Sequence, residues 1–319
     1  MNKLGVAVIG IGFWGRNHVR VFSELPETEL KAVCDVNKER VTAIASQYKV
    51  DAYTDSRKLF QRKDIRAVSV CTWTTTHAEE AVKAIRAGKD ALVEKPLAST
   101  VREAKRIVQF AERRNRRLMV GFIERFNPGV QNLKNMIYRG EIGTIVSATS
   151  KRVSEWPERI GDVGVVKDTA IHDIDVMRYI FDEDPKAVFA KIGNLRHSKY
   201  EDYAQIMLTF ERGRTAFVEA NWLTPYKTRS LLITGSKAIL NLNYLTQEIT
   251  VETAGQSTTS RHAFQEPLKL ELQHFIDCVL NNRTPKVTGV DGLKALQIAE
   301  AAFKSSKQNS AVKLRLGLV

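Results

Sequence analysis

One glycine-rich segment near the beginning of the chain limits its possible folds more than any other feature. Gly10, Gly12 and Gly15 follow the apolar run 4–9 and stand just before a helical pattern over 16–24. In such a G-x-G-x-x-G turn, the first glycine permits the tight turn, the second lets the backbone approach a pyrophosphate, and the third allows close packing of the helix on the strand. The segment therefore predicts the first strand–helix unit of a dinucleotide-binding Rossmann domain.

A carboxylate at the end of the second predicted strand favours the same interpretation over a glycine turn that holds no ligand. Asp35 stands twenty residues after Gly15, directly after the apolar run 30–34. At this position a carboxylate accepts hydrogen bonds from the adenosine ribose, and its charge repels the 2′-phosphate of NADP. NAD is therefore the expected cofactor and NADP is less favoured, although Lys38 and Arg40 nearby act against this preference.

Apolar runs alternate with helical patterns through the first part of the chain. We expect strands at 4–9, 30–34, 67–72, 91–94 and 118–123, and helices at 16–24, 38–48, 77–87 and 101–115. Gly88 stands in a C-cap position, and Ser99 or Thr100 can cap the fourth helix. Continuously apolar strands that alternate with helices predict an α/β domain with a doubly wound parallel sheet. We expect this NAD-binding Rossmann domain to cover residues 1–122.

After about residue 122 the pattern changes to closely spaced strands. A helix ending near Arg139 is followed by strand-like runs at 144–153, 187–193, 204–210, 215–223, 230–234, 238–243 and 248–253, and then by helices at 267–281 and 291–305. Strands joined by short turns are antiparallel neighbours, so residues 123–319 predict a second α/β domain on a largely antiparallel open sheet. An uncovered sheet face also predicts a homo-oligomer, a dimer or tetramer, formed through that face.

The charge composition narrows the expected partners. Lys and Arg number 49 and Asp and Glu 36, which gives a net charge of +13 and favours anionic partners. The densest basic cluster, residues 113–117, stands where a helix ends and has no interleaved aromatic residues, so we do not expect nucleic-acid binding. No apolar run approaches the roughly 20 residues of a membrane span, and the first ten residues lack signal-peptide features. We expect no membrane partner and a cytoplasmic location.

The cysteines indicate neither a metal site nor a disulfide framework. Cys34, Cys71 and Cys278 stand far apart within apolar runs, and the sequence contains no C-x-x-C pair and no Cys/His cluster. We expect buried thiols and no bound metal.

Two segments carry residues suited to proton transfer. Lys95 follows a strand of the predicted parallel sheet, where ligands bind beyond the carboxyl ends of the strands. Asp168 and His172 stand four residues apart at the start of a helical pattern, so a regular helix would place them on one face. Histidine is the side chain best suited to exchange a proton near neutral pH. The alternatives are that Lys95 is only a loop cation and that His172 only caps or packs its helix.

Together these segments resemble the glucose–fructose oxidoreductase/inositol dehydrogenase (Gfo/Idh/MocA) family over nearly the full length. The resemblance rests on residues 8–15, on Cys71-Thr72 followed by His77, on residues 94–97, and on Asp168 with His172. It implies an NAD-dependent dehydrogenase that acts on a CH–OH group.

The resemblance also implies roles for single residues. Lys95 would lie beside the nicotinamide and the substrate hydroxyl, His172 would be the general acid or base, and Asp168 would orient the substrate or that histidine. The backbone of Phe13 and Trp14 would contact the pyrophosphate. Thr72, His77 and Glu94 would complete the cofactor site. Trp73 departs from the family, which usually has a proline there.

The substrate is expected to be a sugar or a sugar nucleotide. Within the family, residues 121–128 resemble the loop of enzymes that oxidise the 3-hydroxyl of UDP-N-acetylglucosamine or its uronate. Arg125, Asn127, Arg152 and Lys167 are the candidate substrate-binding residues, since cations suit an anionic sugar nucleotide. Ion pairs on the surface or between domains are the alternative for the three cations. A dehydrogenase of a free sugar or cyclitol and a non-catalytic dinucleotide-binding regulator are the alternative functions.

Overall fold

The computed structural model of the chain describes residues 3–157, 161–261 and 263–318, and its contacts divide the chain into two units. The first unit contains Met1–Gly121 and Leu268–Leu293, and the second contains Phe122–Pro267 and Lys294–Val319. The chain first passes between units one residue before the predicted boundary at 122. Its return to the first unit at Leu268 was not predicted.

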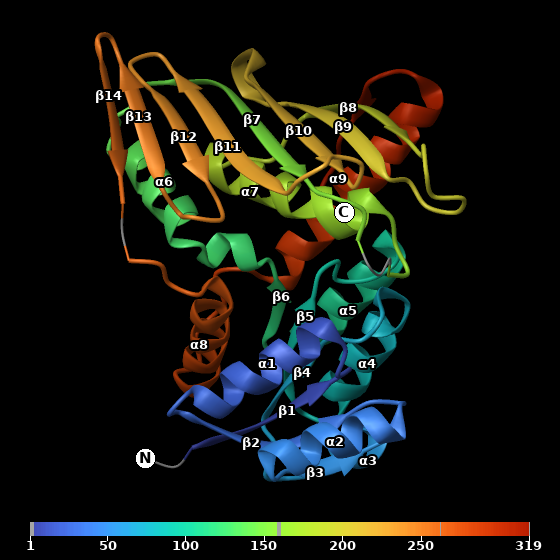
Figure 1. Cartoon of the computed structure of the whole chain (residues 1–319). Coiled ribbons are helices and arrows are strands. Elements are labelled where there is room, and N and C mark those ends of the chain that lie inside the picture. The colour runs from blue at the N-terminus through green and yellow to red at the C-terminus, as the bar shows by residue number, and fades with distance from the viewer. Residues whose placement is uncertain (1–2, 158–160, 262, 319) are drawn as a thin grey trace. The chain divides into compact units, whose positions relative to one another are not determined.

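The first unit contains a six-stranded parallel sheet in the order β3-β2-β1-β4-β5-β6 (Figure 1). Its strands are β1 (Leu4–Ile9), β2 (Thr28–Cys34), β3 (Asp51–Tyr53), β4 (Ala67–Val70), β5 (Asp90–Glu94) and β6 (Leu118–Gly121). Its helices are α1 (Phe13–Glu24), α2 (Lys38–Tyr48), α3 (Ser56–Phe60), α4 (Thr74–Arg86), α5 (Val101–Arg113) and α8 (Pro267–Leu280). Every residue of β1, β4, β5 and β6 is buried, as expected for strands covered on both faces. The predicted doubly wound sheet is confirmed.

Two elements of this unit were not predicted. The strand β3 has only three residues, and none of them is buried. It contains no apolar run of the kind that marks the other strands. The helix α3 has five residues and is capped by Asp55, whose side chain accepts a hydrogen bond from the Arg57 N–H. Short elements of this kind carry too little periodicity to be recognised from sequence.

The second unit contains a nine-stranded sheet in the order β14-β13-β12-β11-β7-β10-β9-β8-β15. Its strands are β7 (Ile145–Val153), β8 (Ala187–Gly193), β9 (Tyr203–Thr209), β10 (Thr215–Asn221), β11 (Thr228–Gly235), β12 (Ile239–Asn243), β13 (Ile249–Thr253), β14 (Gln256–Ser260) and β15 (Val312–Lys313). Its helical elements are η1 (Ile123–Phe126), α6 (Pro128–Tyr138), η2 (Val166–Ala170), α7 (Ile171–Phe181), η3 (Glu211–Gly213) and α9 (Gly289–Gln308), whose first turns belong to the first unit. Neighbouring strands are antiparallel except for the parallel pair β7 and β10.

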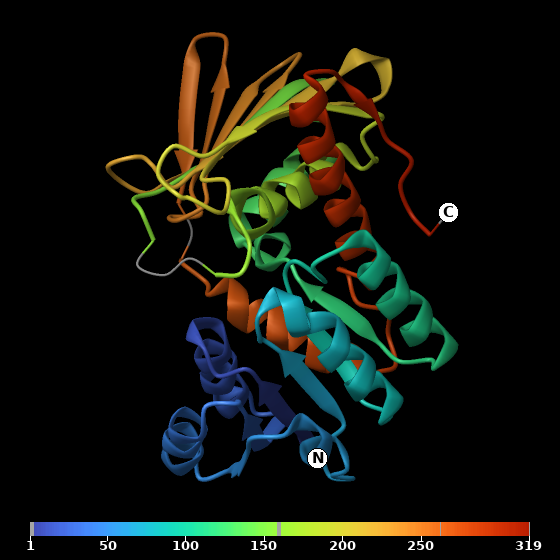
Figure 2. The same ribbon diagram turned by 90° about the vertical axis from the view of Figure 1, so that its right-hand side faces the viewer.

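The two faces of this sheet differ. Along β7 the side chains of Ala148, Ser150 and Arg152 are buried, whereas Thr149 and Lys151 between them are exposed. The helices α6, α7 and α9 lie on one side of the sheet (Figures 1 and 2). The predicted largely antiparallel sheet with helices on one face is confirmed. Self-association through the other face stays a prediction.

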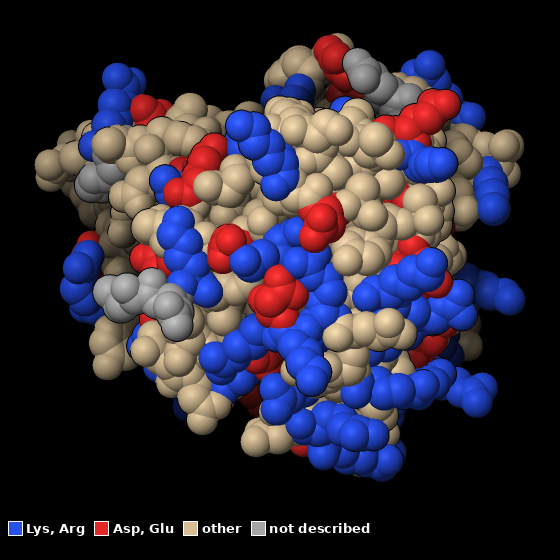
Figure 3. Space-filling model, turned by 90° about the horizontal axis from the view of Figure 1, so that it is seen from below, with Lys and Arg blue, Asp and Glu red and all other residues tan. Residues whose placement is uncertain are grey.

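Basic side chains cover more of the surface than acidic ones in the view of Figure 3. Part of the predicted basic cluster is engaged within the first unit. Arg117 pairs with the buried Asp90, with 3.3 Å from Nη1 to Oδ2, and the Arg114 guanidinium lies 5.5 Å from the centre of the Phe110 ring. Asp90 thus balances the charge of Arg117, and the Phe110 ring contacts the guanidinium of Arg114. The sequence alone does not identify these partners.

The three cysteines are free and buried, as predicted. Burial raises the pKa of the Cys34 thiol to about 12, which keeps it protonated and unreactive. Within the described ranges, no three His, Cys, Asp or Glu side chains gather in a way that could hold a metal ion. No helix in the described part of the chain is long and apolar enough to span a membrane.

Candidate active site

The glycine turn of the first unit leaves no room for side chains at two of its positions. Gly10 has φ +86°, and a Cβ there would lie 2.6 Å from the Thr72 nitrogen. A Cβ on Gly15 would overlap the carbonyl oxygen of Gly10, so only glycine allows α1 to approach the turn this closely. The predicted roles of Gly10 and Gly15 therefore have a direct steric cause.

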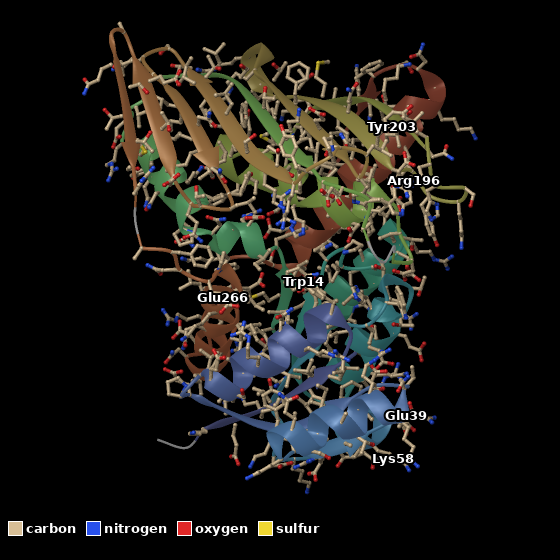
Figure 4. All side chains as sticks on the ribbon, viewed as in Figure 1. Trp14, Glu39, Lys58, Arg196, Tyr203 and Glu266 are labelled. Atoms are coloured by element: carbon tan, nitrogen blue, oxygen red, sulfur yellow. The ribbon has the colours of Figure 1, made fainter. Side chains whose placement is uncertain are left out.

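The helix that follows this turn is open to an anion. Gly12 is its N-cap, no side chain caps its first N–H groups, and its first turn contains no acidic residue. Phe13 and Trp14, which are 74% and 38% exposed, are the first two residues of α1, so their backbone N–H groups belong to this helix start. Figure 4 shows Trp14 at this end of the helix. Uncapped N–H groups and the helix dipole favour a phosphate at this end, which fits the pyrophosphate of NAD.

Asp35 connects the end of β2 to the glycine turn. Its carboxylate accepts hydrogen bonds from the N–H groups of Ile11, at 2.7 Å, and Asn37, at 2.9 Å. Arg40 lies beside it, with 3.3 Å from Nη1 to Oδ2, and partly balances its charge. Asp35 is therefore a support of the turn in addition to its predicted role toward the ribose.

His77 joins the loops that follow β4 and β5. Its Nδ1 lies 2.8 Å from the Pro96 carbonyl oxygen and its Nε2 lies 3.1 Å from the Thr72 carbonyl oxygen. The Thr76 hydroxyl donates a hydrogen bond to the Thr72 hydroxyl at 2.8 Å. Because both loops leave the carboxyl ends of parallel strands, His77 shapes the edge of the sheet where a dinucleotide binds. The side chain of Trp73, in the same loop, is 45% exposed.

Glu94 belongs to a buried pair that the sequence did not reveal. Its Oε1 lies 3.0 Å from Nε2 of His18, and its Oε2 accepts a hydrogen bond from the Lys95 N–H at 3.1 Å. The other ring nitrogen of His18 lies 2.7 Å from the Ser69 hydroxyl. Burial alone would lower the pKa of His18, but Cys71 and the Glu94 carboxylate outweigh it and raise that pKa well above 6.5. The backbone N–H of Lys95 is thus held by Glu94, which is itself paired with His18.

In the second unit, Asp168 and His172 stand on either side of a change in helix type. Asp168 lies in η2, a five-residue π turn, and His172 is the second residue of α7. The regular helix that would place both residues on one face is therefore interrupted, because a π turn inserts an extra residue that periodicity does not reveal. His172 is buried, and its ring meets the edge of Phe122 with 6.2 Å between centroids. Beside Asp168, the Thr169 hydroxyl accepts a hydrogen bond from Trp222 Nε1 at 3.0 Å.

Arg125 and Asn127 are held within the second unit. The Nε and Nη2 atoms of Arg125 donate to the two oxygens of the buried Asp175, each at 2.6 Å. Asn127 caps α6 by accepting from the Gly129 N–H at 3.0 Å, and it donates to Glu124 at 3.1 Å.

Arg152 and Lys167 also have acidic partners. Arg152 is buried, and it donates to Asp173 at 2.6 Å from Nε and to Glu124 at 2.8 Å from Nη1. Burial opposes its charge, but the two carboxylates outweigh burial and raise its pKa. Lys167 lies 3.8 Å from Glu300. Arg125 and Arg152 thus form buried ion pairs within the second unit, which differ from the surface or interdomain pairs considered as the alternative. A substrate role for these cations stays a prediction.

Comparisons with known proteins agree with this geometry. Residues 4–122 match the model of an oxidoreductase family with an NAD-binding Rossmann fold, and residues 130–241 match that of the GFO/IDH/MocA C-terminal domain. An inositol 2-dehydrogenase of Salmonella typhimurium is 30% identical over 321 residues, which cover 95% of this chain and 94% of the relative.

Two solved structures show the same fold. Levoglucosan dehydrogenase in complex with NADH aligns with a TM-score of 0.93 at 23% identity, over 99% of this chain and all of its own. UDP-N-acetylglucosamine 3-dehydrogenase from Acidithiobacillus ferrooxidans aligns with a TM-score of 0.88 at 24% identity, over 97% of this chain and 99% of its own. The predictions of family, fold class, NAD as cofactor and dehydrogenase activity are confirmed.

Proposed function

Since the chain belongs to the GFO/IDH/MocA family of NAD-binding oxidoreductases, we propose that it oxidises a ring hydroxyl of a UDP-sugar. The specific candidate is the 3-hydroxyl of UDP-N-acetylglucosamine or a related uronate. The observation that supports an NAD-dependent oxidation is the glycine turn. A Cβ added at Gly10 or Gly15 would strike backbone atoms, and the helix start beside the turn has no side-chain cap.

The residues of the first unit fit NAD by shape and charge. Gly10, Gly12 and Gly15 with the backbone of Phe13 and Trp14 would hold the pyrophosphate, and one further residue, Asp35, would face the adenosine ribose. When bound, NAD supplies the hydride acceptor for the oxidation.

Each catalytic candidate has a proposed role of its own. His172 takes the proton of the substrate hydroxyl, because imidazole exchanges protons near neutral pH and its ring is positioned by Phe122. Lys95 stabilises the developing alkoxide through its ammonium group, and its backbone is fixed by Glu94. Asp168, one turn before His172, orients the substrate or the histidine.

Two features support a sugar nucleotide as the substrate. The net charge of +13 favours an anionic ligand, and residues 121–128 resemble the corresponding loop of UDP-sugar 3-dehydrogenases. The second candidate is a free cyclitol, which is favoured by the 30% identity with an inositol 2-dehydrogenase.

We also propose that the chain self-associates through the open face of its nine-stranded sheet. Light scattering that finds only monomer would refute that association.

The test is a turnover assay that follows NADH absorbance. UDP-N-acetylglucosamine, its uronate, myo-inositol and glucose are offered with NAD to the wild type and to Lys95→Met and His172→Gln. His172→Gln is expected to lower kcat by about 10²–10⁴-fold, as is usual when a proton-transfer group is lost. Lys95→Met is expected to lower kcat by about 10²–10³-fold through the loss of alkoxide stabilisation. Lys58→Ala is the control, because this side chain is exposed on α3 (Figure 4). The proposal fails if the purified protein neither contains nor binds NAD(H), or if both variants retain full activity.

A further inference from the structure

Two arginines stand directly opposite one another on neighbouring strands of the second unit. Arg152 of β7 pairs in antiparallel register with Arg229 of β11. Residues in such a pair project to the same face, here the one that carries the helices, and like charges in this arrangement repel. Sequence analysis did not single out Arg229, because it stands at the start of an ordinary strand pattern.

Two acidic groups near this pair, Asp173 and Glu124, are already engaged by Arg152. The Oδ1 and Oδ2 atoms of Asp173 receive hydrogen bonds from Arg152, and Oδ1 also accepts from the Tyr244 hydroxyl at 3.2 Å. The Oε1 atom of Glu124 accepts from Arg152 at 2.8 Å, whereas Nη1 of Arg229 is 3.8 Å from the same oxygen. Among the described residues, the Arg229 guanidinium donates no hydrogen bond within 3.5 Å. Its charge is therefore less well balanced than that of Arg152.

A second cation adds to this excess. Lys227 is exposed, and the described residues include no hydrogen-bond or ion-pair partner for its ammonium group. Burial and the nearby Arg152 lower the pKa of Arg229, and Arg229 in turn lowers the pKa of Lys227. Cations that destabilise each other's charged form gain most from a bound anion.

The position of this pair relates it to the catalytic candidates of the same unit. Asp168 is among the carboxylates whose charge acts on Arg229, and Asp173, which pairs with Arg152, directly follows His172. The Arg229 side chain is 36% exposed, so a ligand can reach it.

We propose that Arg229 and Lys227 form the subsite for a negatively charged group of the substrate. This inference rests on the proposed function and assigns the substrate class: a ring sugar that carries a carboxylate or a phosphate. Guanidinium and ammonium groups bind both anions by charge-assisted hydrogen bonds. The subsite takes the role first predicted for Arg125 and Arg152, whose guanidinium groups are held by aspartates.

The test measures binding, so that it does not depend on turnover. The full chain saturated with NAD is titrated by calorimetry with UDP and, separately, with glucuronate. For the probe that binds, Arg229→Gln is expected to lower the affinity by about tenfold or more. Lys227→Gln should lower the affinity less, and Arg229→Lys should retain part of it. Lys237→Gln, an exposed cation after the same strand, is the matched control and should bind like the wild type. Loss of UDP binding identifies a phosphate as the anion, and loss of glucuronate binding identifies a carboxylate.

Thermal unfolding separates a subsite from a structural role. Because Arg229 faces another arginine, Arg229→Gln should leave the unfolding temperature unchanged or raise it. The proposal is overturned if neither probe binds the wild type, if Arg229→Gln binds as tightly as Lys237→Gln, or if it loses binding together with stability. If Arg229→Gln loses binding but the wild type turns over none of the offered sugars, the subsite is supported and the proposed substrates are rejected, so the two failures can be distinguished.

Discussion

The two units hold their candidate site residues by different means. In the first unit the site is made mainly of backbone: glycines at which an added Cβ would strike other backbone atoms, and a helix start without a side-chain cap. In the second unit it is made of charged side chains paired over long sequence distances, such as Arg152 with Asp173, 21 residues apart, and Arg125 with Asp175, 50 residues apart. A site defined by backbone sterics leaves a motif in the sequence, whereas one defined by ion pairs does not.

The largest expected effect is the loss of the buried pair in the second unit. Arg152→Met leaves the carboxylates of Asp173 and Glu124 buried without their main partner, since both accept hydrogen bonds from this arginine. Removing one partner of a buried ion pair costs about 3–5 kcal/mol, so the free energy of unfolding should fall by that amount. Urea unfolding followed by circular dichroism measures it.

The control for that experiment is an ion pair at the surface. Arg139 and Glu141 have side chains 63% and 39% exposed, and pairs of this kind contribute about 0–1 kcal/mol. Arg139→Met should therefore unfold close to the wild-type urea midpoint. Equal effects of the two substitutions would contradict the contrast between buried pairing in the second unit and ordinary surface charge.

The next effect concerns the backbone site of the first unit. Gly15→Ala introduces a Cβ that overlaps the Gly10 carbonyl oxygen, and backbone can yield only by separating α1 from the turn. The affinity for NADH, measured by its fluorescence, should fall by about a hundredfold, which corresponds to roughly 2.7 kcal/mol.

Gly88→Ala is the matched control for Gly15→Ala within the same unit. Gly88 has φ +78°, but a Cβ there would meet nothing within 4 Å. The substitution should cost about 1 kcal/mol of stability through backbone strain and leave NADH affinity unchanged. If both alanine variants bind NADH like the wild type, the steric account of the glycine turn is wrong.

The same contrast explains how much could be predicted from the sequence. The strands and helices of the first unit were predicted except β3 and α3, and α2 was predicted with its observed bounds. The fold class, the glycine turn and the cofactor follow from local patterns, because apolar runs and glycines act through neighbouring backbone. The return of α8 to the first unit could not be predicted, since its apolar stripe does not specify which core it joins.

In the second unit the residue types were recognised but their partners were not. Arg125 and Arg152 were selected for their charge, and only the fold reveals that Asp175 and Asp173 neutralise them. The register that opposes Arg229 to Arg152 depends on the pairing of β7 with β11, which no local pattern encodes. The π turn at Asp168 was missed because it breaks the helical period on which the prediction depended.

The smallest expected effect tests a buried pair of the first unit, His18 with Glu94, that resembles the buried pairs of the second. The pKa of His18 is raised above its usual 6.5 by Cys71 and Glu94 against the effect of burial, so the folded state holds this proton more tightly than the unfolded state. The stabilisation is full below about pH 6.5 and is lost as pH rises through the folded pKa, with a slope of up to about 1.4 kcal/mol per pH unit. His18→Gln should flatten this decline. Burial instead lowers the pKa of His274, so His274→Gln should change the pH dependence of stability only below about pH 6.5. Urea titrations across pH 5–9 compare the three proteins, and an unchanged alkaline slope in His18→Gln would show that the pair with Glu94 carries no proton-linked stability.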